Sequence, residues 1–262
     1  MIDIVVLTKD SEESILQCLK SVCANVPVNK LIIIDGCSKD KTLRAVADFS
    51  SGFLPGSNKV EILQSRGTRG ECRQLGISRI TTDWFMFVDS DVVLCRNWFQ
   101  KAQHLIKRSE RTAACDAEGM PGAVWGIDLD VRTSKSAVIR KLLALVSALS
   151  FSARGGTHDL LVRTDAVKQI EIPRQLHTYE DAYIVNWIRR CGYKVLKDEE
   201  ALFCFHFKPR SDWNLGRSIR QIPQELKCGL VLSRSYRLLF CIPVYILDWL
   251  VHKLSLFRRS DE

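Results

Sequence analysis

Four short, mainly apolar runs in the first ninety residues constrain the fold more than any other feature of the sequence. They are residues 4–7, 31–34, 60–63 and 84–88. Unbroken apolar runs of this length are typical of strands that are buried on both faces, as in parallel sheets. Such a strand needs apolar cover above and below, so the intervening segments must supply it.

Helical patterns lie between these runs, at residues 11–22, 40–49 and 71–80. In the first of them, Ile15 and Leu19 belong to an apolar stripe, and Ser11 is placed to cap the helix. Alternation of strand and helix is typical of a doubly wound α/β sheet. We therefore expect a Rossmann-like, mostly parallel sheet with helices on both faces.

Length and composition agree with this expectation. The chain has 262 residues, of which 46% are hydrophobic and 26% charged, as in ordinary globular proteins. These values exclude a wholly disordered chain, a collagen-like fibre and a multi-span membrane protein. The ten cysteines include no CxxC pair and are scattered among apolar neighbours. We interpret them as reduced core thiols in a reducing compartment rather than as a zinc or disulfide framework.

Polar residues follow the expected strands at the point where each strand ends. Asp35 follows the second, an Arg- and Gly-rich loop at residues 65–70 follows the third, and Asp89-Ser90-Asp91 follows the fourth. In open α/β sheets, ligands bind outside the carboxyl ends of the strands. We therefore expect these groups to converge on one edge of the sheet.

Asp89 and Asp91 are the candidate metal ligands. Carboxylates two residues apart at a strand end can approach one cation, and their oxygens suit hard ions such as Mg²⁺ or Mn²⁺. A solvated acidic turn is the alternative. The loop-to-helix junction at residues 66–77 carries Arg69 and Arg73, four apart, where glycines and a helix N-terminus favour an anion. The alternative there is an exposed basic loop, because neither a Walker nor a GxGxxG pattern is present.

Residues 177–181 open a further predicted helix that ends at Gly192. Glu180 and Asp181 at its start either complement the helix dipole or supply a general base near the edge of the sheet. His206 lies in a strand-like apolar segment, where it is either a metal ligand or a buried structural residue. For His158 and His177 we expect local hydrogen bonding rather than metal ligation.

These motifs together resemble the family-2 glycosyltransferases of GT-A fold, over residues 2–207. The matching stretches are residues 5–10, 34–42, 72–77, 88–91, 179–181 and 192–195. The sequence departs from the family where Gly36-Cys37 replaces the usual second Asp and Gly, which leaves UDP and GDP both open. It also has no clear Gln-x-x-Arg-Trp, the signature of processive synthases.

The resemblance implies an inverting transfer of a sugar from a nucleotide-sugar, with roles for particular residues. The implied assignments are Thr8 and Asp35 at the nucleoside, Arg69 and Arg73 with the donor, Asp89 at the ribose or metal, Asp91 and His206 at a Mg²⁺ or Mn²⁺ ion, Asp181 as catalytic base with Glu180 beside it, and Gly155 and Gly156 on the acceptor side.

The remaining residues, 208–262, are expected to form a basic amphipathic extension to a domain of residues 1–207. The chain carries a net charge of +8, and the segment 238–247 is apolar with basic and aromatic flanks. It is too short to span a bilayer, so we expect it to lie on an anionic membrane surface, with 140–149 as a second such segment. Packing on the domain, or a dimer interface, is the alternative for both.

We therefore expect a peripheral enzyme on the cytoplasmic face of a membrane, with a glycan or lipid-linked acceptor. A polyprenyl (dolichyl)-phosphate sugar synthase is the alternative. A sugar nucleotidyltransferase is disfavoured because Thr8-Lys9-Asp10-Ser11 stands where a Gly-rich basic loop would be. A non-catalytic sugar-nucleotide-binding protein is disfavoured because Asp89, Asp91 and Asp181 are all present. The sequence contains no aromatic RNA-binding motif, so we expect no nucleic-acid partner.

Overall fold

The computed structural model describes residues 1–52, 59–116, 119–130, 156–197, 202–206, 223 and 226–228. The strands are β1 (Ile2–Thr8), β2 (Val28–Asp35), β3 (Lys59–Gln64), β4 (Trp84–Asp89), β5 (Val92–Leu94), β6 (Pro121–Trp125), β7 (Ile127–Asp130), β8 (Asp159–Arg163), β9 (Lys194–Lys197) and β10 (Phe203–His206). The helices are α1 (Ile15–Asn25), α2 (Thr42–Gly52), α3 (Arg69–Ile77), α4 (Trp98–Asp116), α6 (Thr164–Val167) and α7 (Glu180–Arg190).

Seven strands form the central sheet, in the order β3-β2-β1-β4-β8-β6-β9. Neighbouring strands are parallel except where β8 runs antiparallel to β4 and β6. A smaller sheet has the order β5-β10-β7. The prediction of a mostly parallel, Rossmann-like sheet is therefore confirmed.

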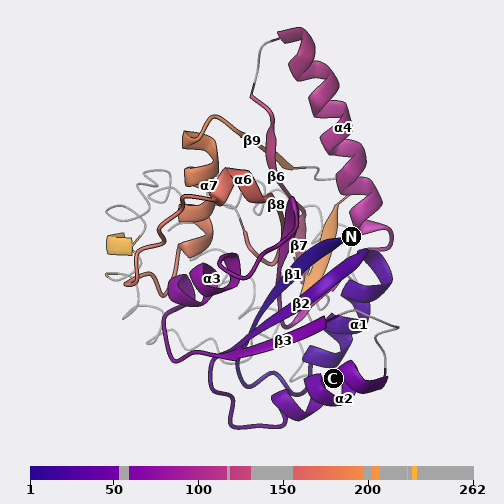
Figure 1. Cartoon of the computed structure of the whole chain (residues 1–262), viewed down its shortest axis with the longest axis vertical. Helices are drawn as coiled ribbons and strands as arrows, with labels where there is room; N and C mark the ends of the chain where they lie inside the picture. Colours follow the sequence, from indigo (N-terminus) through magenta and orange to yellow (C-terminus); the bar gives the residue numbers. More distant parts are fainter. Residues whose placement is uncertain are drawn as a thin grey trace, which may run out of the picture.

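Alternate residues of the central strands enter two apolar cores, one on each face of the sheet. In β1, Ile4 and Val6 face one core while Val5 faces the other. The first core is shared with α1, α2 and α4, and the second with α3, α6 and α7. Figure 1 shows these two groups of helices on opposite sides of the strands. Burial on both faces explains the apolar runs in β1, β2 and β4, whereas the edge strand β3 carries Glu61 and an exposed Ile62.

The first predicted helix begins later than expected. Its first residue is Ile15, because residues 12–14 form a turn. Ser11 does not cap it, and that prediction was wrong. The Ser11 hydroxyl donates to the Lys9 carbonyl (3.1 Å) and lies 2.9 Å from the Ser90 hydroxyl, next to the acidic turn. Ser11 therefore connects the end of β1 to the end of β4.

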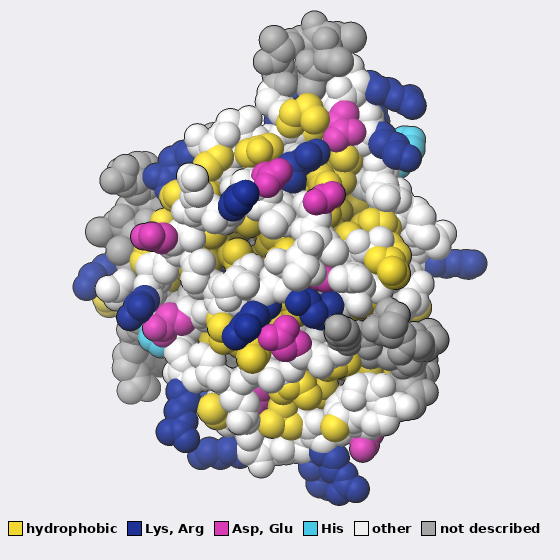
Figure 2. Space-filling view, in the orientation of Figure 1, with side chains coloured by type: hydrophobic (Ala, Val, Ile, Leu, Met, Phe, Trp, Pro, Cys, Tyr) yellow, Lys and Arg dark blue, Asp and Glu magenta, His cyan; other side chains and the backbone are white. Residues whose placement is uncertain are grey.

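Part of the predicted layout lies outside the described residues. This applies to Gly155, to the segment 140–149, to the boundary at residue 207, and to the apolar segment 238–247. Within the C-terminal part, Cys228 is described and is buried in the second core. No helix among the described residues is both long and apolar enough to cross a bilayer. On the face shown in Figure 2, Lys and Arg side chains are interspersed with Asp and Glu rather than gathered in one patch.

Candidate functional site

The carboxyl ends of β1, β2 and β4 lie side by side at one edge of the central sheet. Thr8 pairs in register with Asp35, and Leu7 pairs with Asp89. The Thr8 hydroxyl is buried and has no hydrogen-bond partner among the described residues. The predicted convergence of polar groups from distant parts of the sequence is therefore present, and Thr8 brings an unused polar atom to it.

Asp35 is fully buried and held from two sides. Its carboxylate accepts hydrogen bonds from the Ser38 N–H (3.0 Å), the Ser38 hydroxyl (2.5 Å) and the Gln64 side-chain amide (3.2 Å). Cys37, which lies between Asp35 and Ser38 in the chain, adopts a positive φ of 58°, a conformation that glycine tolerates better. Gln64 was not predicted, although it directly follows the third apolar run; in the structure it ends β3, in register with Asp35.

Arg73 is buried and forms an ion pair with Asp89. One terminal nitrogen, Nη2, donates to Asp89 Oδ1 and to the Thr157 hydroxyl, both at 2.7 Å. The guanidinium carbon lies 4.8 Å from the centre of the Phe87 ring. Nε and Nη1 are buried without a partner among the described residues. Of the two arginines predicted at this junction, Arg69 is exposed and Arg73 is buried.

This ion pair keeps Asp89 ionised. Partial burial raises the pKa of its carboxyl, but the charge and hydrogen bond of Arg73 outweigh that effect, and His206 and His158 add to it. The pKa of Asp89 therefore lies below its ordinary value. A carboxylate with a lowered pKa stays charged at neutral pH and can face a cation or a ribose hydroxyl.

Asp91 and His206 lie together although they are far apart in the sequence. The β5–β10 pairing sets His206 opposite Val92, and His206 Nε2 lies 3.8 Å from Asp91 Oδ1. Both side chains are partly exposed, at 20% for His206 and 28% for Asp91. Neighbouring ligands of an octahedral Mg²⁺ ion are about 3 Å apart, since each bond is about 2.1 Å long. With small side-chain movements, this oxygen and nitrogen fit one divalent cation.

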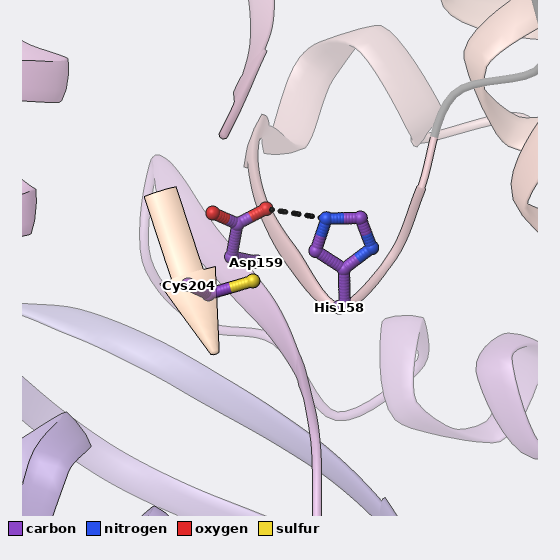
Figure 3. Close-up of side chains that lie close together, drawn as sticks. All are labelled: His158, Asp159 and Cys204. Carbon is purple, nitrogen blue, oxygen red and sulfur yellow. Dashed lines mark ion pairs between the residues drawn. The ribbon is translucent and has the colours of Figure 1, made fainter. Parts of the chain in front are cut away.

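A second group of candidate ligands is buried next to this site. His158, Asp159 and Cys204 place one ligand atom each within 4.8 Å of one another. Figure 3 shows the three side chains close together, with the contact between His158 Nε2 and Asp159 Oδ1 dashed; these atoms are 3.2 Å apart. Asp159 also accepts hydrogen bonds from the Trp98 indole (2.9 Å) and the Gly126 N–H (3.0 Å). Asp159, Trp98 and Cys204 were not predicted, because no local pattern in the sequence distinguishes them.

Glu180 and Asp181 begin α7, directly after Tyr179, which has a positive φ of 64°. Asp181 Oδ1 accepts the Ala182 N–H at 2.7 Å. Burial, then the charge of Asp181, raises the pKa of Glu180 to about 7, while Arg73 and Arg69 oppose the rise. The charges of both arginines thus act on Glu180, which makes the predicted helix start a candidate part of the same site.

The loop that precedes α7 is fastened to α3. The Gly70 N–H donates to the Leu176 carbonyl (2.9 Å), and the Thr68 hydroxyl donates to the Arg174 carbonyl (2.7 Å). These hydrogen bonds hold the loop before α7 against α3, the helix that contains Arg73. Of the two glycines predicted on the acceptor side, Gly156 is described and buried, and its neighbour Thr157 contacts Arg73.

Comparison with known families decides the affiliation of the chain. Residues 3–143, just over half of the chain, match the model of the family described as Glycosyl transferase family 2. The chain belongs to glycosyl transferase family 2. The prediction of a glycosyltransferase is thereby confirmed. No curated protein matches the sequence of this family 2 member.

Solved structures share its fold at low sequence identity. Residues 1–349 of S. aureus TarS, in complex with UDP-GlcNAc, are 16% identical, with a TM-score of 0.58 over 80% of this chain and 59% of that one. Glucosyl-3-phosphoglycerate synthase of Mycobacterium tuberculosis, with Mn²⁺, UDP and glucosyl-3-phosphoglycerate, is 17% identical (TM-score 0.57; 87% of this chain, 78% of that one). The mannosyltransferase PcManGT of Pyrobaculum calidifontis, with GDP-Man and Mn²⁺, is 13% identical (TM-score 0.57; 97% and 80%).

The family 2 chain is shorter than some of these proteins. It spans 39% and 59% of two TarS chains, one of them the complex with UDP-GlcNAc. The likeness to these structures establishes the GT-A fold.

Proposed function

We propose that this family 2 member transfers a sugar, with inversion, from a nucleotide-diphosphate sugar to a hydroxyl of a glycan or lipid-linked acceptor. The observation that carries the proposal is the gathering of three groups at one sheet edge. These are the Thr8–Asp35 pair, the Asp89–Asp91–His206 group, and the Glu180–Asp181 pair beside Arg73. Each supplies a different requirement of a single-displacement transfer.

On the donor side, the chain's own residues bind and orient the nucleotide-sugar. Thr8 offers its unpaired hydroxyl, and Asp35 is fixed by Ser38 and Gln64 to receive polar hydrogens of the base or ribose. Arg69, which is exposed at the start of α3, is available to the diphosphate. Solved relatives bind UDP-GlcNAc and GDP-Man, so both nucleotides stand as candidate donors.

Asp91 and His206, with Asp89 close by, would hold a divalent cation, Mg²⁺ or Mn²⁺. When bound, it would offset the negative charge that builds up on the departing diphosphate. Two of the structurally similar proteins contain Mn²⁺. Asp89, which stays ionised through Arg73, would add negative charge on the protein side of the same site.

On the acceptor side, Asp181 is proposed as the general base. The acceptor oxygen attacks the anomeric carbon from the face opposite the diphosphate, and the bond from that carbon to the phosphate oxygen breaks. The acceptor proton passes to the Asp181 carboxylate. One displacement of this kind inverts the anomeric configuration. Of the two glycines expected on the acceptor side, Gly155 is proposed to let the acceptor approach closely, since the space beside Gly156 is filled by the His158 imidazole.

Donor binding with and without metal tests the proposal. We expect calorimetry to detect at least one UDP- or GDP-sugar that binds wild-type protein with Mn²⁺ and loses affinity in EDTA. Asp91→Ala should remove the metal-dependent part of that affinity. Asp48→Ala, which deletes an exposed carboxylate on α2, should behave as wild type. Metal-independent binding, or normal metal dependence in Asp91→Ala, would contradict the metal assignment.

We further propose that the protein works at the cytoplasmic face of a membrane. The support is in the sequence alone. Residues 206–262 hold ten Lys and Arg against five Asp and Glu, around the apolar segment 238–247. Basic charge next to apolar and aromatic side chains favours an anionic lipid surface.

A further inference from the structure

His158 contacts both sides of the candidate cation site. Its carbonyl accepts the Asp89 N–H at 3.3 Å, and its ring lies 6.0 Å, centre to centre, from the ring of His206. A second ring, Trp125, also lies 6.0 Å from it and is almost perpendicular to it. Ring centres at this separation are in packing contact. The imidazole therefore contacts both a core tryptophan and the candidate metal ligand His206.

Asp159 lies against the His158 ring. Asp159 has no exposed surface, and both of its oxygens accept N–H groups, from Trp98 on α4 and from the backbone of Gly126. His158 Nε2 lies 3.2 Å from Asp159 Oδ1, a close contact whose geometry makes no hydrogen bond among the described residues. A carboxylate already engaged by these donors is better explained as an anchor for the ring than as a metal ligand.

Two glycines make room for this arrangement. A Cβ on Gly126 would overlap Asp159 Oδ2 and would crowd the backbone of Leu202. A Cβ on Gly156 would overlap the His158 imidazole. The ring and its anchor thus occupy space that any other residue at either position would fill. The close approach of Gly126 to Asp159 and of Gly156 to His158 indicates that the position of the His158 ring is specific.

We propose that His158, packed against Asp159, is a positioning residue whose ring sets the orientation of His206 for the divalent cation. The inference rests on the proposed function, because it assigns a cation to Asp91 and His206. His158 itself does not touch the cation. Its effect passes through the ring of His206, so removing the His158 ring leaves the ligand atoms in place but less well ordered.

Direct measurement of Mn²⁺ binding tests the inference without an assay of activity. Calorimetric titration of Mn²⁺ into wild-type protein saturated with UDP gives the reference affinity. Loss of a residue that orients a metal ligand costs about 10- to 100-fold in metal affinity, so His158→Ala should weaken Mn²⁺ binding at least about 10-fold. The double variant with His206→Ala decides the route. If His158 acts through His206, the second substitution should add little to His206→Ala alone.

Val162→Ala provides the matched control for lost stability. Val162 is fully buried on the same strand, β8, and its pairing partners are Phe85 and Ala123. It should lower the free energy of unfolding and leave Mn²⁺ affinity unchanged. If His158→Ala does not fold, His158→Phe keeps an aromatic ring against Trp125 but cannot contact Asp159 through nitrogen, and it should also weaken Mn²⁺ binding.

Three results would overturn the inference. Folded His158 variants with wild-type Mn²⁺ affinity would show that the ring orders nothing that matters to the cation. Full additivity with His206→Ala would show that His158 does not act through His206. An equal loss in Cys204→Ser would make the buried trio itself the metal site. The proposed function fails separately, if wild-type protein with UDP takes up no Mn²⁺ at all, and this inference then fails with it.

Discussion

Arg73 shows how much the role of one charged residue depends on where its side chain is placed. In the sequence it belongs to a basic loop-to-helix junction, which favours an anion of the substrate. In the structure its guanidinium is buried against Phe87 and bonded to Asp89 and Thr157. Its closest anion is thus supplied by the protein. Removing one partner of such a pair leaves an uncompensated charge, so Arg73 and Asp89 are expected to tolerate substitution poorly.

The first prediction concerns Asp181. Asp181→Asn keeps the shape of the side chain but cannot accept a proton from a hydroxyl acceptor. A positioned base contributes about 10²- to 10⁴-fold, so turnover should fall within that range while donor affinity survives. Transfer rate and calorimetric donor affinity measure the two effects. A much smaller loss would instead favour an acceptor that is already anionic, such as a polyprenyl phosphate.

The second prediction concerns the pH dependence of stability. The pKa of Glu180 rises from its ordinary value of 4.5 to about 7, so between these values the folded state holds a proton that the unfolded state has lost. Stability must then fall as pH rises through this window and level off above it. Glu180→Gln should remove that decline, a difference of up to about 3 kcal/mol between pH 5 and pH 8.

Urea unfolding at the two pH values measures the effect. Glu171→Gln, which neutralises an exposed carboxylate close by in the chain, should decline with pH as wild type does. A wild-type protein whose stability does not fall relative to Glu180→Gln would contradict the raised pKa.

Among the elements, α3 is packed unusually close to the sheet. A Cβ on Gly76 would lie 2.5 Å from Val5 Cγ1 on β1, closer than real side chains approach. The third prediction follows. Gly76→Ala should destabilise the protein by about 1–3 kcal/mol through overpacking, although alanine favours a helix over glycine by about 1 kcal/mol.

In the background of Val5→Ala the sign should reverse, since the space is then open and only the helix preference remains. A double-mutant cycle of unfolding free energies measures this. Equal effects of Gly76→Ala in both backgrounds would rule out the contact as the cause.

The fourth prediction concerns the start of α3. Thr68 and Glu71 form a capping box, in which each side chain accepts the backbone N–H of the other residue. The Thr68 hydroxyl also donates to Arg174 in the loop before α7. Thr68→Ala should cost about 1–2 kcal/mol in unfolding free energy, and Thr68→Ser should cost much less. If both cost the same, the methyl group rather than the hydroxyl matters.

The elements that the sequence predicted are those with a local signal. The strands that carry Asp35 and Asp89 are buried on both faces, so their composition alone identified them. No element was predicted between residues 92 and 176 apart from the segment 140–149. There, β5 has three residues and β8 runs against its neighbours, and neither property leaves a periodic pattern. Thr157 and Gln64, which bond the predicted residues Arg73 and Asp35, were missed because contacts between residues far apart in the chain leave no local sequence pattern.

For the whole molecule, the fifth prediction concerns the membrane. Deleting residues 229–262 removes apolar surface together with five of the ten basic residues of the extension. We expect the full chain to sediment with anionic liposomes, less so as salt increases, and the deletion variant to stay in the supernatant. Neutral liposomes should retain less of either protein. A full chain that never sediments with anionic liposomes would make the extension a packing or dimer element.

The two halves of the candidate site also differ in how early in folding they can form. The Thr8–Asp35 edge joins strands linked by a single short helix, whereas the β5–β10 pair joins residues about 110 apart in the sequence, at a larger loop-closure cost in entropy. Pairings of that separation form late. During refolding, the proposed nucleoside side of the site should therefore form before the proposed cation side, and the two should appear as separate steps.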